Sequence, residues 1–168
     1  MMGGEKEKLK KQKYNEFYMD MAERVAKMSY AKRLQVGSIL VKDGNIISFG
    51  WNGMPSGWDN NCEDVETTFD VRDTCNSNDW KYEENTKKYY RLKTKPQVLH
   101  SEQNLLMKLS KSSNSSNGAY LFVTHAPCLD CAKLVYQSGI STVYYRNEYR
   151  TDEGIRFLEK CGVKVERV

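Results

Sequence analysis

The sequence predicts a single-domain α/β sandwich, and three observations support this fold class. From residue 102 onward, apolar runs of helical and strand-like character alternate, in the order helix, strand, helix, strand, helix, strand. A hairpin pattern precedes them, and 168 residues are enough to bury one core around a sheet. Because each later strand follows a helical crossover, we expect those strands to be parallel.

The N-terminal part predicts a helix and a hairpin. Residues 14–29 place apolar side chains near helical spacing. Two β-prone runs follow, Ser38–Val41 and Ile46–Phe49, and Asp43-Gly44 is a typical hairpin turn between them. The lysine-rich residues 1–13 are interpreted as a solvated or frayed polar tail rather than a nucleic-acid-binding arm. The single domain is therefore expected to span residues 14–168.

Residues 59–96 are interpreted as an insertion into this domain. The segment is mostly polar, and the stretch just before it, 51–58, contains Gly, Asn and Pro. Connections of this length in a small domain are usually functional or locally disordered. A short helix is predicted around Trp80–Arg91.

The C-terminal part predicts three helices and three strands, joined after the first helix by a turn-rich linker at 111–118. Pro127 begins the second helix and Gly139 ends it, as the preferences of helix termini suggest. The predicted helices are 102–109, 127–139 and 152–162, and the predicted strands are 119–126, 141–147 and 163–168.

Composition and charge exclude several classes of function. Charged residues make up 29% and apolar residues 39% of the chain, as in soluble globular proteins. We expect no membrane contact and a cytoplasmic location, because no apolar run approaches about 20 residues and no signal peptide is evident. Residues 1–13 contribute +3 of the net charge of +4. The nearly neutral remainder argues against nucleic acid as a partner.

Five cysteines, at positions 62, 75, 128, 131 and 161, do not suggest a disulfide framework. The number is odd, and thiols remain reduced in the cytosol. Cys128 and Cys131, in "PCLDC", are three residues apart at a helix start and point to one side, where the helix dipole lowers thiol pKa. With His100 they would give zinc three ligands, leaving a fourth position for water, as in catalytic sites. The alternative is a core histidine and two buried thiols.

Glu102, two residues after His100, is the candidate catalytic residue. Zinc can lower the pKa of bound water to about 7, and a nearby carboxylate can take that proton and deliver it to a substrate. The alternative is a carboxylate that merely stabilises a helix N-terminus. Neither the pair His100 and Glu102 nor the pair Cys128 and Cys131 is by itself decisive evidence for a zinc enzyme.

The order His-x-Glu followed by Pro-Cys-x-x-Cys resembles the zinc signature of the cytidine deaminase superfamily. Within it, "HSEQN", "FGWNGMPSG" and "QVGSILVKDGNIIS" are similar to motifs of deoxycytidylate (dCMP) deaminases. Ser101 stands where that family usually has alanine, and Trp51 where it has tyrosine. The resemblance implies a three-layer α/β/α fold with a central five-stranded mixed sheet. Residues 59–96 lie outside the resemblance.

The resemblance also implies an activity, the hydrolysis of dCMP to dUMP and ammonia, which supplies dUMP for thymidylate synthesis. Zn²⁺ would be the cofactor, one ion per subunit, held by His100, Cys128 and Cys131. The implied substrate contacts are Asn52 with the deoxyribose 3′-hydroxyl, the Ser101 N–H with the pyrimidine O2, and Arg33 and Tyr149 with the phosphate. Ser29 and Arg150 are weaker phosphate candidates.

Regulation is implied by the same resemblance. Relatives are homo-oligomers, commonly hexamers, activated by dCTP and inhibited by dTTP. The expected effector site includes Asn52, Gly53, Pro55 and Gly57, with Mg²⁺ accompanying the triphosphate. Some relatives bind a second zinc in the insertion; Cys62 and Cys75 lie there, but the absence of a histidine favours ordinary thiols.

Two other functions fit the same residues. One is a deaminase for another cytosine or guanine compound. The other is a zinc-stabilised nucleotide-binding protein without turnover, against which the retained Glu102 argues.

Overall fold

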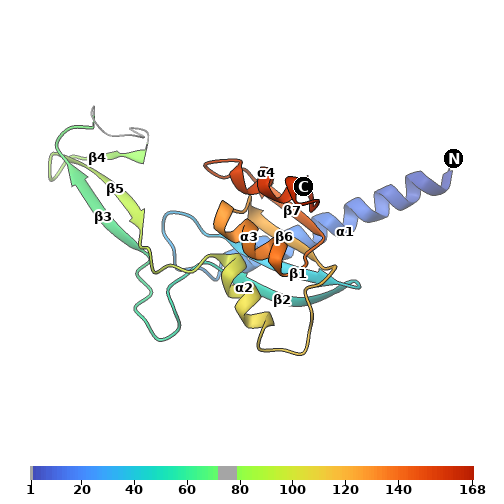
Figure 1. Ribbon diagram of the computed structural model, residues 1–168. Coiled ribbons are helices and arrows are strands. Elements are labelled where there is room, and N and C mark those ends of the chain that lie inside the picture. The colour runs from blue at the N-terminus through green and yellow to red at the C-terminus, as the bar shows by residue number, and fades with distance from the viewer. Residues whose placement is uncertain (1, 72–78) are drawn as a thin grey trace.

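The computed structural model describes residues 2–71 and 79–168, which form four helices and eight strands (Figure 1). In chain order they are α1 (Met2–Ala26), β1 (Gly37–Lys42), β2 (Asn45–Trp51), β3 (Glu63–Thr68), β4 (Lys81–Glu83), β5 (Lys88–Thr94), α2 (Ser101–Leu109), β6 (Tyr120–His125), α3 (Leu129–Gln137), β7 (Thr142–Asn147), α4 (Glu153–Lys160) and β8 (Lys164–Arg167).

The central sheet has five strands in the order β2-β1-β6-β7-β8. Strand β1 pairs antiparallel with β2 and with β6, whereas β6, β7 and β8 pair in parallel. Helices α3 and α4 provide the crossovers that parallel neighbours require. The predicted mixed sheet, with parallel later strands, is confirmed.

The predicted β1–β2 hairpin is also confirmed, and its turn explains why. Asp43 and Gly44 are the two loop residues, and both have positive φ, 50° and 77°. A two-residue turn of this kind matches the right-handed twist of the strands. The pairing then shifts register between Leu40 and Val41, which is an irregularity of the bulge type.

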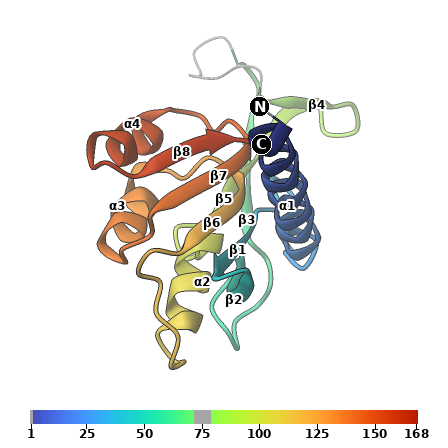
Figure 2. The ribbon, with the colours of Figure 1, turned by 90° about the vertical axis from the view of Figure 1, so that its right-hand side faces the viewer.

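Helices cover both faces of the sheet and give the predicted three layers (Figure 2). Along β6, Leu121 and Val123 face a core formed with α2, α3 and α4, whereas Phe122 faces α1. On the α1 face, the Phe122 ring stacks on Tyr144 at 4.6 Å and Met19 is fully buried. The strand is apolar on both faces because both faces are covered.

The N-terminal segment is helical where the sequence suggested a tail. Helix α1 begins at Met2, and its first part extends beyond the sheet, with exposed side chains from Gly4 to Tyr14 (Figure 1). This run contains Glu, Lys, Leu and Gln, which favour helix, and Glu7 precedes Lys11 by four residues. Local propensity therefore favours continuing the helix over this exposed run.

The helix predicted around Trp80–Arg91 is wrong. Strands β4 and β5 form a hairpin there and join β3 in a separate three-stranded sheet, in the order β3-β5-β4 (Figure 1). Tyr82 and Tyr89 are cross-strand partners whose rings lie 5.1 Å apart, a pairing that stabilises sheets. Lys87, with φ of 54°, occupies the turn. Cross-strand packing therefore outweighs the weak helical pattern.

The four cysteines in the described ranges are free thiols. Cys62 is buried in a small cluster with Ala31 and Val98, and Cys161 is partly buried at the end of α4. Cys75 lies outside the described residues. None of the helices in those ranges has the length and hydropathy needed to cross a bilayer.

Gly154 generates a stability prediction, because α4 lies directly on the loop that leads into α3. A Cβ at Gly154 would lie 2.0 Å from the Pro127 carbonyl oxygen. Gly154→Ala is expected to cost about 1–3 kcal/mol in unfolding free energy, since backbone must move. Gly4→Ala is the matched control, because its Cβ meets nothing within 4 Å. Thermal unfolding followed by circular dichroism checks this, and an unchanged midpoint for Gly154→Ala would contradict it.

Candidate zinc centre and active site

The candidate metal centre lies where two helix N-termini meet. His100 is the N-cap residue of α2 and Cys128 is the N-cap residue of α3. Both have extended backbone, and Cys131 follows in the first turn of α3. The Gln103 side-chain oxygen accepts a hydrogen bond of 2.8 Å from the His100 N–H. This capping contact fixes the start of α2 and with it the position of the imidazole.

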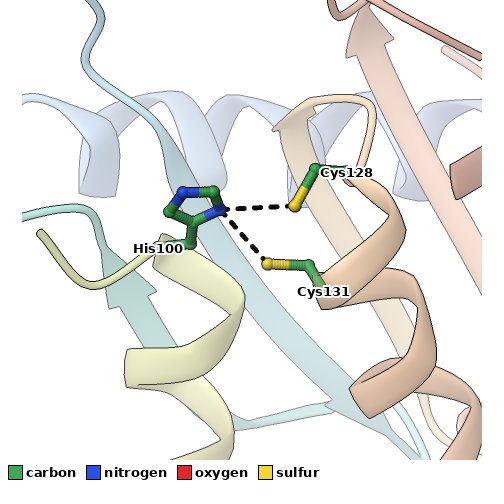
Figure 3. Close-up of side chains that lie close together, drawn as sticks. All are labelled: His100, Cys128 and Cys131. Carbon is green, nitrogen blue, oxygen red and sulfur yellow. Dashed lines mark hydrogen bonds between the residues drawn. The ribbon is translucent and has the colours of Figure 1, made fainter. Parts of the chain in front are cut away.

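The three side chains converge from α2 and α3 (Figure 3). The His100 Nδ1 atom lies 3.5 Å from the Cys128 sulfur and 3.3 Å from the Cys131 sulfur. All three ligand atoms lie within 4.8 Å of one another. Bonds of about 2.3 Å to sulfur and about 2.05 Å to nitrogen at tetrahedral angles give a sulfur–nitrogen separation of about 3.5 Å. The donor set and spacing therefore fit zinc with one position left open.

Hydrogen bonding within this cluster favours the thiolate form of Cys128. A hydrogen bond from the Cys131 thiol lowers the pKa of Cys128 to about 4, although partial burial opposes this. The same contact, together with burial, raises the pKa of Cys131. The hydrogen bond to Cys128 raises the pKa of His100. One thiolate is thus available at neutral pH, and metal binding releases the proton of the second.

Glu102 lies beside this cluster and is almost completely buried, with 4% of its surface exposed. Burial raises the pKa of its carboxyl group, and the Ser101 hydroxyl opposes this by donating a 2.9 Å hydrogen bond to Oε2. A carboxyl group with a raised pKa can both accept and release a proton near neutral pH. The serine that replaces the family's alanine therefore contacts the candidate catalytic group.

A cavity of about 850 Å³ opens over these residues. It brings together most of the side chains that the sequence singled out, although they come from separate parts of the chain. The predicted site residues in its lining are Arg33, Asn52, His100, Ser101, Glu102, Cys128, Tyr149 and Arg150. Its volume lies in the upper part of the usual range for ligand sites, about 300–1,000 Å³.

Asn52 shapes this cavity through its amide group. Its oxygen accepts a 2.8 Å hydrogen bond from the Val36 N–H, and its nitrogen donates to the Leu34 carbonyl at 2.9 Å. The Ser29 hydroxyl donates a hydrogen bond of 2.7 Å to the main-chain carbonyl oxygen of Asn52. Asn52 and Ser29 therefore hold the loop between α1 and β1.

The other predicted effector residues, Gly53, Pro55 and Gly57, are not among the residues lining the cavity. Gly53 nevertheless pairs with the residue that precedes His100. It forms an antiparallel bridge with Leu99, with hydrogen bonds of 2.9 and 3.1 Å. Because Leu99 immediately precedes His100, this loop is coupled through backbone to the first zinc ligand.

Several lining residues come from the insertion and were missed by the sequence reasoning. Strand β5 contributes Arg91, Lys93 and Thr94, and Asp79 also lines the cavity. The available signal was the alternation in "YRLKT", which places Arg91 and Lys93 on one side of a strand. His125, at the end of β6, also lines the cavity, and burial lowers its pKa.

Comparison with known proteins gives consistent results. Residues 12–147 match the family model "Cytidine and deoxycytidylate deaminase zinc-binding region". The chain is 32% identical to ComE operon protein 2 of Bacillus subtilis over 156 residues, which are 92% of this chain and 71% of that protein. It is 33% identical to human deoxycytidylate deaminase over 134 residues, covering 79% of this chain but 64% of the relative.

The solved structures include a protein of similar length. The dCMP deaminase of cyanophage S-TIM5, in complex with dCMP and dUMP, is 43% identical, with a TM-score of 0.72. The alignment covers 91% of this chain and 95% of that one. A Thermotoga maritima deaminase/reductase, at 22% identity and a TM-score of 0.60, shares the fold.

An α/β/α sandwich with a His/Cys/Cys cluster and an adjacent buried glutamate defines a zinc-dependent hydrolase of the nucleobase deaminase class. The match over residues 12–147 makes the assignment more specific. The chain belongs to the cytidine and deoxycytidylate deaminase family.

The geometry of the cluster predicts one zinc ion per chain. Cys131→Ala should reduce bound zinc to well below one equivalent, because two ligands cannot complete the tetrahedral site. Cys161→Ser is the matched control, since Cys161 is a free thiol outside the cluster. Elemental analysis after dialysis against a weak chelator checks this. Full zinc retention by Cys131→Ala would show that the cluster is not the metal site.

Proposed function

We propose that this protein catalyses the hydrolytic deamination of dCMP to dUMP and ammonia. The observation that carries the proposal is the buried Glu102 beside the His100, Cys128 and Cys131 cluster, in the wall of a cavity that also presents arginines. A relative of nearly the same length, 43% identical, binds both dCMP and dUMP. Cationic side chains in the cavity favour a phosphorylated substrate over a free nucleoside.

His100, Cys128 and Cys131 would hold a zinc ion, which would supply Lewis-acid activation of a water molecule. A carboxylate oxygen of Glu102 takes the proton of that water and passes it to N3 of cytosine. The water oxygen bonds to C4. Glu102 then takes the remaining proton from the hydroxyl on C4 and delivers it to the exocyclic amine. The C4–N bond breaks, ammonia leaves, and the C4 oxygen becomes the carbonyl of dUMP. The buried position of Glu102 suits it to both transfers because its pKa is raised.

The remaining site residues are proposed to orient the nucleotide. The Ser101 N–H donates to the pyrimidine O2, and Asn52 contacts the 3′-hydroxyl. Arg33 and Tyr149 bind the phosphate. Their presence in one cavity supports these roles, and the Arg33 side chain is fixed there by a 3.2 Å hydrogen bond to Thr94.

Regulation by deoxynucleoside triphosphates is proposed for the loop from Asn52 to Gly57. The Gly53–Leu99 bridge gives a physical path, because movement of the loop would displace the residue preceding His100. The Asn104 side chain adds a second link, donating to the Trp51 carbonyl at 2.8 Å. We propose that dCTP activates and dTTP inhibits, each with Mg²⁺, in a homohexamer that supplies dUMP for thymidylate synthesis.

Replacing the proton shuttle tests the mechanism. Glu102→Gln keeps the shape of the side chain but removes proton transfer, which contributes at least about 10²-fold to such reactions. We expect full zinc content and a loss of dCMP turnover of at least this size, measured as ammonia release. Glu153→Gln, on an exposed side chain in α4, is the matched control.

The same assay distinguishes the alternative functions. Wild-type protein should release ammonia from dCMP faster than from deoxycytidine, cytidine, CMP or dCTP. Preference for another compound would reassign the substrate, and release from none would indicate a nucleotide-binding protein without turnover. Turnover of dCMP by Glu102→Gln at the wild-type rate would exclude Glu102 as the shuttle.

The regulatory proposal predicts an effector-dependent saturation curve. The dCMP concentration for half-maximal rate should fall with dCTP and rise with dTTP, because each binds one conformational state better than the other. Steady-state rates with and without each triphosphate and Mg²⁺ provide the measurement. Identical curves in every condition would rule the proposal out.

A further inference from the structure

Strand β5 of the insertion forms part of the wall of the cavity that contains the zinc cluster. Its consecutive residues Arg91, Leu92, Lys93 and Thr94 all line that cavity. Arg91 and Lys93 are two residues apart, so they lie on the same face of the strand. The insertion therefore adds two cations to a site whose chemical groups come from α2 and α3.

Arg91 is held in a defined position. Its Nε and Nη2 atoms each lie 2.7 Å from Oε2 of Glu66, the residue opposite it on β3. The guanidinium group also stacks over the Trp80 ring, 4.8 Å from its centre. Nη1 has no partner within residues 2–71 and 79–168, and 26% of the side chain is exposed. An arginine whose Nε and Nη2 atoms are paired with a carboxylate still has N–H donors available on Nη1.

Glu66 balances only part of this charge. Lys93 donates to its other oxygen, Oε1, at 2.8 Å, so one carboxylate serves two cations. Arg33 is joined to the same strand through Thr94, and Arg150 lies elsewhere in the lining.

Three carboxylates also line the cavity. Glu148 is paired with Arg167 at 3.0 Å, and Glu102 is buried beside the zinc cluster. Asp79 is the third. Around β5, Arg33, Arg91 and Lys93 outnumber the carboxylates Glu66 and Asp79 by one, so this part of the wall has a net positive charge.

We propose that Arg91, assisted by Lys93, binds the 5′-phosphate of a nucleoside monophosphate in this cavity, in addition to Arg33 and Tyr149. The inference rests on the proposed function and extends it, because it makes the insertion part of the substrate site. Phosphate is the matching ligand, since an arginine with donors on one edge can make short, charge-assisted hydrogen bonds to its oxygens. The cavity, at about 850 Å³, has room for a nucleotide between the zinc cluster and β5.

The experiment compares dCMP with deoxycytidine, which differs only by the phosphate. The ratio of their kcat/KM values isolates the phosphate contact from the chemical step. Arg91→Gln should lower this ratio roughly 10- to 100-fold, the usual effect of losing charge-assisted hydrogen bonds. Values for deoxycytidine should stay within about threefold of wild type. Lys93→Gln, on a side chain that is 63% exposed, should lower the ratio about threefold.

Two further variants separate phosphate binding from a structural role. Glu66→Gln breaks the same ion pair but leaves both cations, so the ratio should stay equal or rise. Lys88→Gln removes a charge from the same strand, where Lys88 stacks on Phe69 outside the cavity lining, and should leave the ratio unchanged. An unchanged ratio for Arg91→Gln, or an equal fall for Glu66→Gln, would overturn the proposal.

A binding measurement keeps this test independent of the proposed reaction and of folding. Calorimetric titration of wild-type protein should show tighter binding of dCMP than of deoxycytidine, and Arg91→Gln should lose that difference. If Arg91→Gln does not fold, as judged by circular dichroism, Lys93→Gln decides by the same comparison. Wild type that binds dCMP through Arg91 but releases no ammonia would refute the proposed function and support this inference.

Discussion

The structure depends on one constraint: a histidine at the start of one helix must meet two cysteines at the start of another. His100 lies 3.3 and 3.5 Å from the two sulfur atoms, although the residues are 31 and 28 positions apart in sequence. Parallel β6 and β7, with the α3 crossover between them, place Cys128 and Cys131 at the carboxyl end of β6. Helix α2 packs on the same face of the sheet and brings His100 to that edge.

Several backbone contacts hold the N-termini of α2 and α3 close together. Gln103 fixes the His100 backbone, and the Gly53–Leu99 bridge fixes the residue before it. Gly154 allows α4 to pack against the Pro127 carbonyl. Each of these contacts acts on backbone rather than on a ligand atom, so together they fix the helix ends that carry His100 and Cys128.

Much of the fold and of the chemical centre could be predicted from the sequence, because those features have local signatures. Asp43-Gly44 specifies its own turn, and the apolar β6 strand requires cover on both faces. The insertion was not predictable in this way. Strand β4 has only three residues, all exposed, and pairs such as Tyr82 and Tyr89 reveal their role only across the sheet. The position of Arg91 in the cavity depends on how that sheet folds back, which no local pattern encodes.

The insertion also contributes residues to the wall of the cavity. The zinc-side residues can explain the chemistry of deamination, whereas the cations on β5 can explain selection of a phosphorylated substrate. Zinc-edge X-ray absorption spectroscopy of the purified protein tests the central claim most directly. The account predicts two sulfur ligands at about 2.3 Å and two nitrogen or oxygen ligands at about 2.0–2.1 Å, one of the latter from solvent. A shell of three or four sulfur atoms, or protein without bound zinc, would contradict it.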